Sequence, residues 1–133
     1  MAGKIILYAE DNPDDVLIFQ RVFRKATLPH TLYCVDDGEA AIEWLTGGGL
    51  YSDRQRYPVP DILLLDLKMP RKGGMEVLEW VRGSEKFKVI PVLILSSSDD
   101  PTDVKRAYSL GATTYFVKSA ASQDVVQYLR LLT

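Results

Sequence analysis

The chain has 133 residues, of which 47% are hydrophobic and 26% charged, and its formal net charge is −2. These values are ordinary for one globular domain that buries roughly two thirds of the surface of its unfolded chain. The net charge excludes a basic nucleic-acid footprint. The apolar runs are too short for a membrane span or a signal-peptide core. From the chain length we expect a single domain over 1–133 without an output domain.

Apolar, β-rich runs alternate with amphipathic segments along the whole chain. We expect strands at 4–9, 31–35, 61–66, 89–95 and 113–117, and helices at 13–27, 37–47, 74–85, 101–111 and 122–132. Continuous apolar strands that alternate with helices are typical of a parallel sheet covered on both faces. The sequence therefore predicts an α/β fold of five βα units.

An unusual density of acids follows the first expected strand, in the stretch "EDNPDD". Asn12 suits a helix N-cap, Pro13 suits the first helical position, and the two aspartates after it favour the positive end of the helix dipole. This structural interpretation does not explain Glu10 and Asp11, which precede the cap. For these two acids a solvated loop is the alternative to a functional site.

The residues that follow the other strands favour the functional site. In a doubly wound sheet, ligands bind beyond the carboxyl ends of the strands, where the strand order reverses. Asp36 and Asp37, after the second strand, are interpreted as a turn and a helix start. The first, third, fourth and fifth strands bring polar groups to one sheet edge: Glu10, Asp11, Asp66, Ser96 and Lys118.

The charges of this set indicate its chemistry. Three clustered carboxylates repel one another unless a cation lies among them. Oxygen ligands suit a hard divalent ion, and Mg²⁺ is usually held by one or two carboxylates together with phosphate oxygens and water. A carboxylate beside Mg²⁺ and a lysine is also a competent nucleophile toward phosphorus. The sequence therefore predicts phosphoryl transfer onto a carboxylate.

Four segments carry a family resemblance that covers nearly the whole chain: "EDN" after the first strand, "LLLDLKMP" with Asp66, "LILSSS" with Ser96, and "YFVK" with Lys118. In this order they resemble the receiver domain of two-component response regulators. The resemblance implies a flavodoxin-like (βα)5 fold with strand order 2-1-3-4-5. It also implies a cytoplasmic signalling switch rather than a conventional enzyme, which catalyses its own phosphorylation and dephosphorylation.

The same resemblance implies a role for each site residue. Asp66 would accept a phosphoryl group from a sensor histidine kinase, and Lys118 would contact that group. Asp11, Asp66 and the backbone carbonyl of Lys68 would bind Mg²⁺ directly, and Glu10 would act through metal-bound water. Ser96 and Tyr115 would form the switch pair, which reshapes the face made by helix 101–111, strand 113–117 and helix 122–132 for a partner or a second copy.

Two substitutions and one extension depart from the family pattern. Ser119 stands where the family usually has proline, often after a cis bond, and Ser96 replaces the commoner threonine but keeps the hydroxyl. The connection 47–60 is longer than usual, as in stand-alone receivers that serve phytochrome-type histidine kinases. We expect it at the sheet end opposite the carboxylates. Its residues Tyr51, Arg54, Arg56 and Tyr57 form either a docking surface or a plain solvated loop.

The remaining notable side chains are interpreted structurally. Cys34 cannot form an internal disulfide, as is typical of a reducing compartment, and is expected in the core. Trp44 and Trp80 fall on apolar helix stripes and are expected to be buried or half-buried. His30 is expected to be exposed at a turn.

In the last helix a core stripe of Val125, Leu129 and Leu132 leaves Val126 and Leu131 to one side. With Tyr108 and Tyr115, these two residues could form a dimer or partner surface.

Two other classes of protein were compared with the receiver interpretation. A phosphatase of the haloacid-dehalogenase type also places a nucleophilic aspartate after a strand, but it needs a second acid two positions on, where this chain has Lys68. A receiver that has become a pure interaction module would be expected to lack part of the acid and lysine set, and this chain keeps all of it. No nucleic acid or membrane is expected among the partners.

Overall fold

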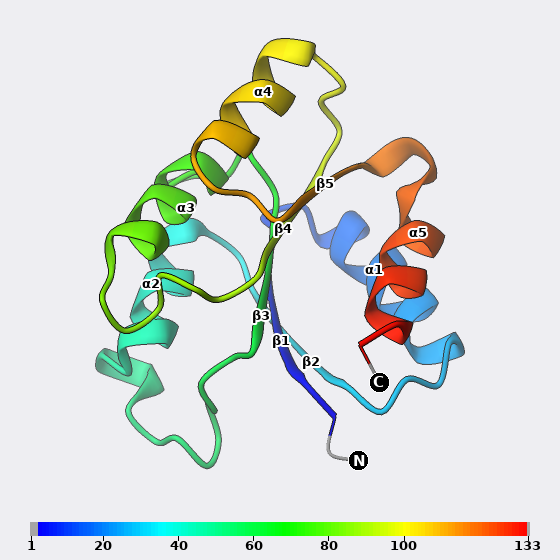
Figure 1. The fold of residues 1–133 in the computed structure, drawn as a ribbon. Coiled ribbons are helices and arrows are strands. Elements are labelled where there is room, and N and C mark those ends of the chain that lie inside the picture. Colours follow the sequence, from blue (N-terminus) through cyan, green and yellow to red (C-terminus); the bar gives the residue numbers. More distant parts are fainter. Residues whose placement is uncertain (1–2, 133) are drawn as a thin grey trace.

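A computed structural model of the chain describes residues 3–132, apart from the side chains of 119–122. Its centre is a sheet of five parallel strands in the order β2-β1-β3-β4-β5 (Figure 1). The strands are β1 (Ile5–Ala9), β2 (Thr31–Val35), β3 (Ile62–Leu65), β4 (Val92–Ser96) and β5 (Thr114–Val117). The helices are α1 (Pro13–Lys25), α2 (Gly38–Thr46), α3 (Gly74–Gly83), α4 (Pro101–Ser109) and α5 (Lys118–Arg130), with a 3-10 turn, η1 (Gly49–Tyr51). The expected flavodoxin-like architecture and strand order are confirmed.

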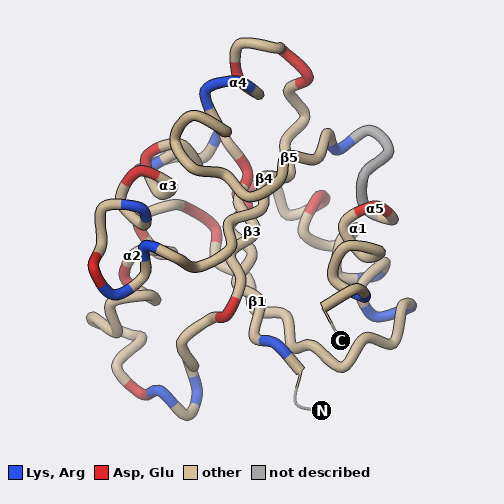
Figure 2. Tube along the Cα trace, in the orientation of Figure 1, with Lys and Arg blue, Asp and Glu red and all other residues tan. Residues whose placement is uncertain are grey.

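Each face of the sheet buries its own apolar cluster. Ile6 and Tyr8 of β1 pack with Phe19 of α1, in the cluster that α1 and α5 cover. Leu7 and Ala9 lie in the other cluster, which α2, α3 and α4 cover. Successive strand side chains point to opposite faces, so a strand buried on both sides must be apolar throughout. Accordingly the strands carry no charged residue, and the charges lie on helices and loops (Figure 2).

The helix ends follow the expected local chemistry. The Asn12 side chain accepts hydrogen bonds from the backbone N–H groups of Asp14 and Asp15 at 2.9 and 3.3 Å, with Pro13 as the first helical residue. Gly47 ends α2 with a φ of +77°, in the left-handed region that suits glycine. The start of α1 and the end of α2 therefore lie at the residues that the sequence predicts.

Two elements begin more than one residue away from the position that the sequence pattern predicts. β4 starts at Val92 rather than residue 89, because Ile90 donates its N–H to Phe87 in a turn and Arg82 donates to the carbonyl of Ile90 at 2.6 Å. The last helix starts at Lys118, directly after β5, rather than at residue 122. This places the lysine at a strand-to-helix junction.

The expectation that His30 is exposed was wrong, because only 6% of this residue is accessible. Its Nδ1 accepts the N–H of Lys4, and its Nε2 lies 2.9 Å from the carbonyl oxygen of Leu129. The ring thus joins the start of β1 to the end of α5. Val126, expected beside the core stripe, is also buried, whereas Leu131 is exposed.

The expectation for the two tryptophans is met, whereas Cys34 lies at the edge of the core rather than in it. Trp44 is buried and Trp80 is half-buried. Cys34 is only half-buried, where burial raises the pKa of its thiol and its sulfur accepts a hydrogen bond from Gln20. Among residues 3–132, no helix combines the length and the apolar character needed to cross a bilayer.

Candidate functional site

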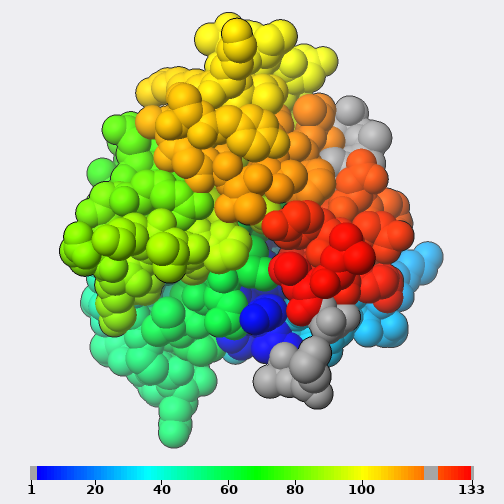
Figure 3. All heavy atoms as spheres, in the orientation of Figure 1, coloured from blue at the N-terminus to red at the C-terminus, as the bar shows by residue number. Residues whose placement is uncertain are grey.

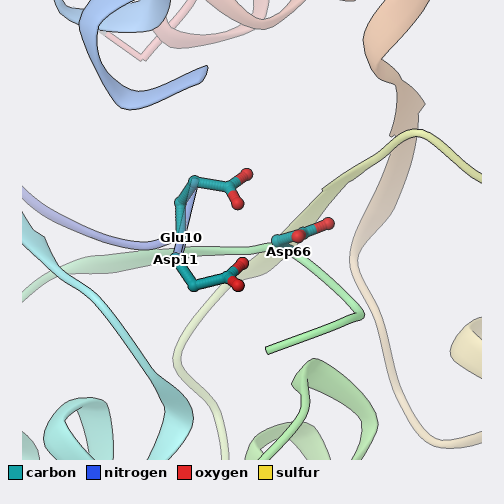
Figure 4. A group of neighbouring side chains, drawn as sticks. All are labelled: Glu10, Asp11 and Asp66. Carbon is teal, nitrogen blue, oxygen red and sulfur yellow. The ribbon is translucent and has the colours of Figure 1, made fainter. Parts of the chain in front are cut away.

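Three carboxylates meet where β1 and β3 end. Glu10 and Asp11 follow β1, Asp66 follows β3, and one oxygen from each lies within 4.8 Å of the others (Figure 4). Glu10 and Asp66 are buried, whereas Asp11 is exposed. β1 and β3 are neighbours in the parallel sheet, so their carboxyl ends lie side by side. The predicted acid cluster is therefore assembled by the strand order itself.

Glu10 is held by donors on both of its oxygens. The Tyr8 hydroxyl donates to Oε1 at 3.2 Å, and the backbone N–H of Asn12 donates to Oε2 at 3.1 Å. Lys118 Nζ lies 2.5 Å from Oε1. Burial, and then the negative charge of Glu10, raise the pKa of the Tyr8 hydroxyl, so it stays a donor. Glu10 is thus held in place by three donors and has little freedom to turn toward a ligand.

Of the two buried carboxylates, Asp66 has fewer hydrogen-bond donors than Glu10. Its Oδ1 accepts the N–H of Leu67 at 2.9 Å, and its Oδ2 lies 3.6 Å from Lys118 Nζ. Burial, and then the charge of Glu10, raise the pKa of Asp66 to about 7, although Lys118 partly offsets them. An added cation beside this carboxylate would relieve both effects. The donor set, made of carboxylate oxygens, fits a hard divalent ion.

Lys118 supplies the positive charge, as predicted, and the structure adds a partner that sequence reasoning missed. Asp15 Oδ2 lies 2.8 Å from Lys118 Nζ. Burial lowers the pKa of the ammonium, but hydrogen bonds to Asp15 and Glu10 and the charge of Asp66 outweigh it, so the pKa is raised. Asp15 was interpreted only as a residue of the first helical turn, and no sequence signal links it to a lysine 103 positions away.

The expected switch residues lie on the next strands. Ser96 is buried at the end of β4, and its Oγ accepts the N–H of Ser98 at 3.2 Å. Tyr115 of β5 is half-buried and donates its hydroxyl to the carbonyl of Ser98 at 2.8 Å. The backbone N–H of Tyr115 donates to the Tyr108 hydroxyl. Both residues of the pair therefore contact the β4–α4 loop through Ser98, which sequence reasoning had not linked to the switch.

The loop after β3 is tied to the start of α2. Lys68 is exposed in this loop. Farther on, Arg71 has a φ of +64°, and its Nε donates to the buried carboxylate of Asp37 at 2.6 Å. Gly38 donates its N–H to the carbonyl of Lys72, and a Cβ on Gly38 would lie 2.2 Å from that oxygen. Asp37, expected only at a helix start, also anchors the loop that carries Lys68.

The long connection 47–60 is anchored internally and is not a plain solvated loop. Arg54 donates to the carbonyls of Trp44, Leu45 and Tyr57 at 2.6, 2.7 and 3.1 Å. The rings of Tyr51 and Tyr57 each lie with their centroids 5.1 Å from that of Trp44. Arg56 lies over the ring of Tyr57.

The connection leaves the sheet at the end opposite the carboxylates, as expected (Figure 1). Tyr51 nevertheless lines a groove that Glu10 and Asp11 also line. The docking role proposed for this connection stays a prediction. Ser119, which stands where the family usually has proline, is one of the residues 119–122 whose side chains the structure does not describe.

An acidic pocket at the carboxyl ends of a flavodoxin-like sheet, with a lysine and a hydroxyl beside it, defines a receiver domain. The family model of the response regulator receiver domain matches residues 6–130. The chain therefore belongs to this family, whose members are signalling switches of two-component systems and bind Mg²⁺ or Mn²⁺ at such a pocket.

Proteins similar to this chain include phytochrome response regulators. Response regulator Rcp1 of Synechocystis sp. is 35% identical over 127 residues, which cover 96% of this chain and 84% of the relative. The crystal structure of a response regulator in red light signaling of R. palustris has a TM-score of 0.85 and 37% identity, covering 97% and 90% of the two chains. The phosphorylated cyanobacterial phytochrome response regulator RcpA has a TM-score of 0.83 and 34% identity, covering 98% and 91%. The expected resemblance to stand-alone receivers is confirmed.

Proposed function

We propose that Asp66 is the phospho-acceptor of this receiver. One observation carries the proposal: Asp66 is a buried carboxylate of the acid cluster, with Lys118 Nζ 3.6 Å from its Oδ2. An Asp66 oxygen attacks the phosphorus of a phosphohistidine. The new O–P bond forms as the P–N bond breaks, and the imidazole leaves with the electron pair. The product is an acyl phosphate on Asp66.

Asp11, Asp66 and the backbone carbonyl of Lys68 would hold Mg²⁺, which supplies positive charge to the oxygens of the transferring group. Glu10 suits an indirect role, because Tyr8, Asn12 and Lys118 already donate to its two oxygens. Lys118 carries a charge that can turn toward the phosphoryl oxygens. Asp66 must lose its proton before it attacks, and a cation beside it favours that form.

A phosphorylation assay tests the assignment. The purified chain, incubated with Mg²⁺ and a small-molecule phosphodonor, should gain one phosphoryl group by intact mass. Asp66→Asn should gain none, whereas Asp36→Asn should gain one as the wild type does. Asp36 is a matched control because it is an exposed acid that also follows a strand, β2, of the same sheet. Labelling of Asp66→Asn to the wild-type extent would contradict the assignment.

The phosphoryl group is proposed to act on the face formed by α4, β5 and α5, which lie next to one another in Figure 3. The phosphorylated Asp66 side chain would carry a charge of about −2, against −1 for the free carboxylate. Ser96 and Tyr115 both contact the β4–α4 loop through Ser98, so a shift of the Ser96 hydroxyl toward phosphate also reaches the tyrosine. Tyr108 and Leu131 are exposed large side chains on α4 and after α5.

This reshaped face would bind a partner or a second copy. Sedimentation with and without phosphodonor separates the two versions. A mass that is unchanged by phosphorylation would contradict the homodimer.

A phytochrome-type histidine kinase is the proposed phosphodonor in the cell, and the cytoplasm the proposed location. The support is the similarity to Rcp1 and to the red-light regulator of R. palustris. Phosphotransfer rates from a panel of purified kinases test this proposal. A faster transfer from kinases of other classes than from phytochrome-type kinases would contradict it.

A further inference from the structure

The Lys118 ammonium lies at unequal distances from three carboxylates. Its Nζ is 2.5 Å from Glu10 Oε1, 2.8 Å from Asp15 Oδ2 and 3.6 Å from Asp66 Oδ2. The ammonium is within hydrogen-bonding reach of Glu10 and Asp15, whereas the distance to Asp66 is too long for a hydrogen bond. In this state Lys118 is therefore bound to α1 and to the end of β1, and is displaced from Asp66.

The two hydrogen-bonded carboxylates differ in how easily they can release the ammonium. The Glu10 side chain is 1% exposed, so a loss of its cationic partner would leave a buried charge unpaired. The Asp15 side chain is 33% exposed, so water can replace the lysine there at little cost. Asp15 is therefore the partner that Lys118 can exchange.

The surroundings of Lys118 leave room for such an exchange. A cavity of about 80 Å³ lies between α1 and the sheet, and its lining includes Tyr8, Asp15, Leu95 and Lys118. A lysine carries three donors on a flexible stem. The ammonium can keep its bond to Glu10 while it gives up Asp15. A movement of about one ångström toward Asp66 would then bring it within hydrogen-bonding distance of an acceptor there.

We propose that Asp15 is a positioning residue, which holds the Lys118 ammonium away from Asp66 in the unphosphorylated chain and yields it to the phosphoryl group. The inference rests on the proposed role of Asp66. Phosphorylation raises the negative charge at this position from −1 to about −2, and the balance between the acceptors then favours Asp66. Asp15 thus weakens the phosphorylated state by the free energy of its own ion pair.

The predicted consequence is that Asp15→Asn stabilises the phosphoryl-bearing state. A partly exposed ion pair of this kind corresponds to a roughly two- to five-fold change in an equilibrium constant. Beryllofluoride, a tetrahedral analogue of a carboxylate-bound phosphoryl group, is titrated into the metal-loaded chain with Mg²⁺ in excess, and NMR reports its binding constant. Asp15→Asn should bind it two- to five-fold more tightly than the wild type.

Two comparisons distinguish positioning from a general charge effect. Asp14→Asn removes the same charge from the same helical turn, where the Asp14 side chain is exposed, and should change the binding constant less than Asp15→Asn. In a Lys118→Met background, Asp15→Asn should have no effect, because the residue acts only through the lysine. Urea unfolding of each variant verifies that it is folded.

Each result decides the proposal. An unchanged or weaker affinity in Asp15→Asn overturns it and leaves the role of Asp66 intact, provided that the wild type binds the analogue. An equal gain in the Lys118→Met background also overturns it, because the effect would then be purely electrostatic. A wild type that does not bind beryllofluoride at all would overturn both the role of Asp66 and the role of Asp15.

Discussion

The raised pKa of Asp66 predicts how the stability of the metal-free protein depends on pH. Burial and the neighbouring Glu10 charge raise this pKa from 3.8 to about 7. Between these two values the folded protein retains a proton that the unfolded chain has released. The free energy of unfolding therefore falls as the pH rises through this interval, and this contribution is fully lost above the folded pKa.

The magnitude follows from the proton difference. One proton contributes about 1.4 kcal/mol per pH unit. From about pH 5 to about pH 7, the loss of stability due to Asp66 is roughly 2 kcal/mol, because the native carboxyl is itself half titrated at the upper limit. Asp66→Asn should lack this decrease, and above about pH 7 it should be more stable than the metal-free wild type.

The assay is urea unfolding in the presence of a chelator at several pH values, for the wild type, Asp66→Asn and Asp36→Asn. The difference between the first two curves isolates Asp66 from the other acids. Asp36→Asn should retain the wild-type slope. Added Mg²⁺ should reduce the gap between wild type and Asp66→Asn at neutral pH, because the cation stabilises the carboxylate. Parallel curves for wild type and Asp66→Asn would refute this reasoning.

Three further substitutions test contacts outside the acid cluster by urea unfolding. Arg54→Gln should lose about 2–4 kcal/mol, because three carbonyls lose a charged donor, while phosphorylation of the chain stays at the wild-type extent; a stability within error of wild type would contradict the anchoring role. His30→Ala should lose about 2–3 kcal/mol, since the N–H of Lys4 and the carbonyl of Leu129 lose their partner, and a neutral effect would count against this bridge. Arg71→Ala should lower the free energy of unfolding by leaving the Asp37 carboxylate without its charged partner, and should weaken Mg²⁺ binding in an NMR titration; unchanged metal affinity would show that the loop holds its shape without the bridge.

The main site residues could be predicted because the βα repeat determines where they lie. Glu10, Asp66 and Lys118 each follow a strand, and parallel strands bring their carboxyl ends to one edge. Their identity and rough proximity therefore need no knowledge of side-chain packing. The same reasoning located the caps of α1 and α2, which depend on residues only a few positions apart.

The contacts that escaped prediction join residues far apart in the sequence. Asp15 meets Lys118 because α1 and α5 cover the same face of the sheet, and a helix-start aspartate looks the same with or without such a partner. His30 is buried because backbone groups of Lys4 and Leu129 satisfy both ring nitrogens. The Arg71–Asp37 bridge likewise requires the loop after β3 to return to α2. No periodicity or composition reports such pairings.

The internal anchoring of the 47–60 connection makes it a practical attachment point for reporters. Arg54 and the aromatic rings hold the segment to α2 from within, whereas Gln55, between two of these anchors, is exposed. If Cys34 is replaced, a cysteine introduced at position 55 would attach a fluorophore to this anchored segment, at the end of the sheet remote from Asp66. Such a label would report the binding of a partner to the face formed by α4, β5 and α5 without occupying that face.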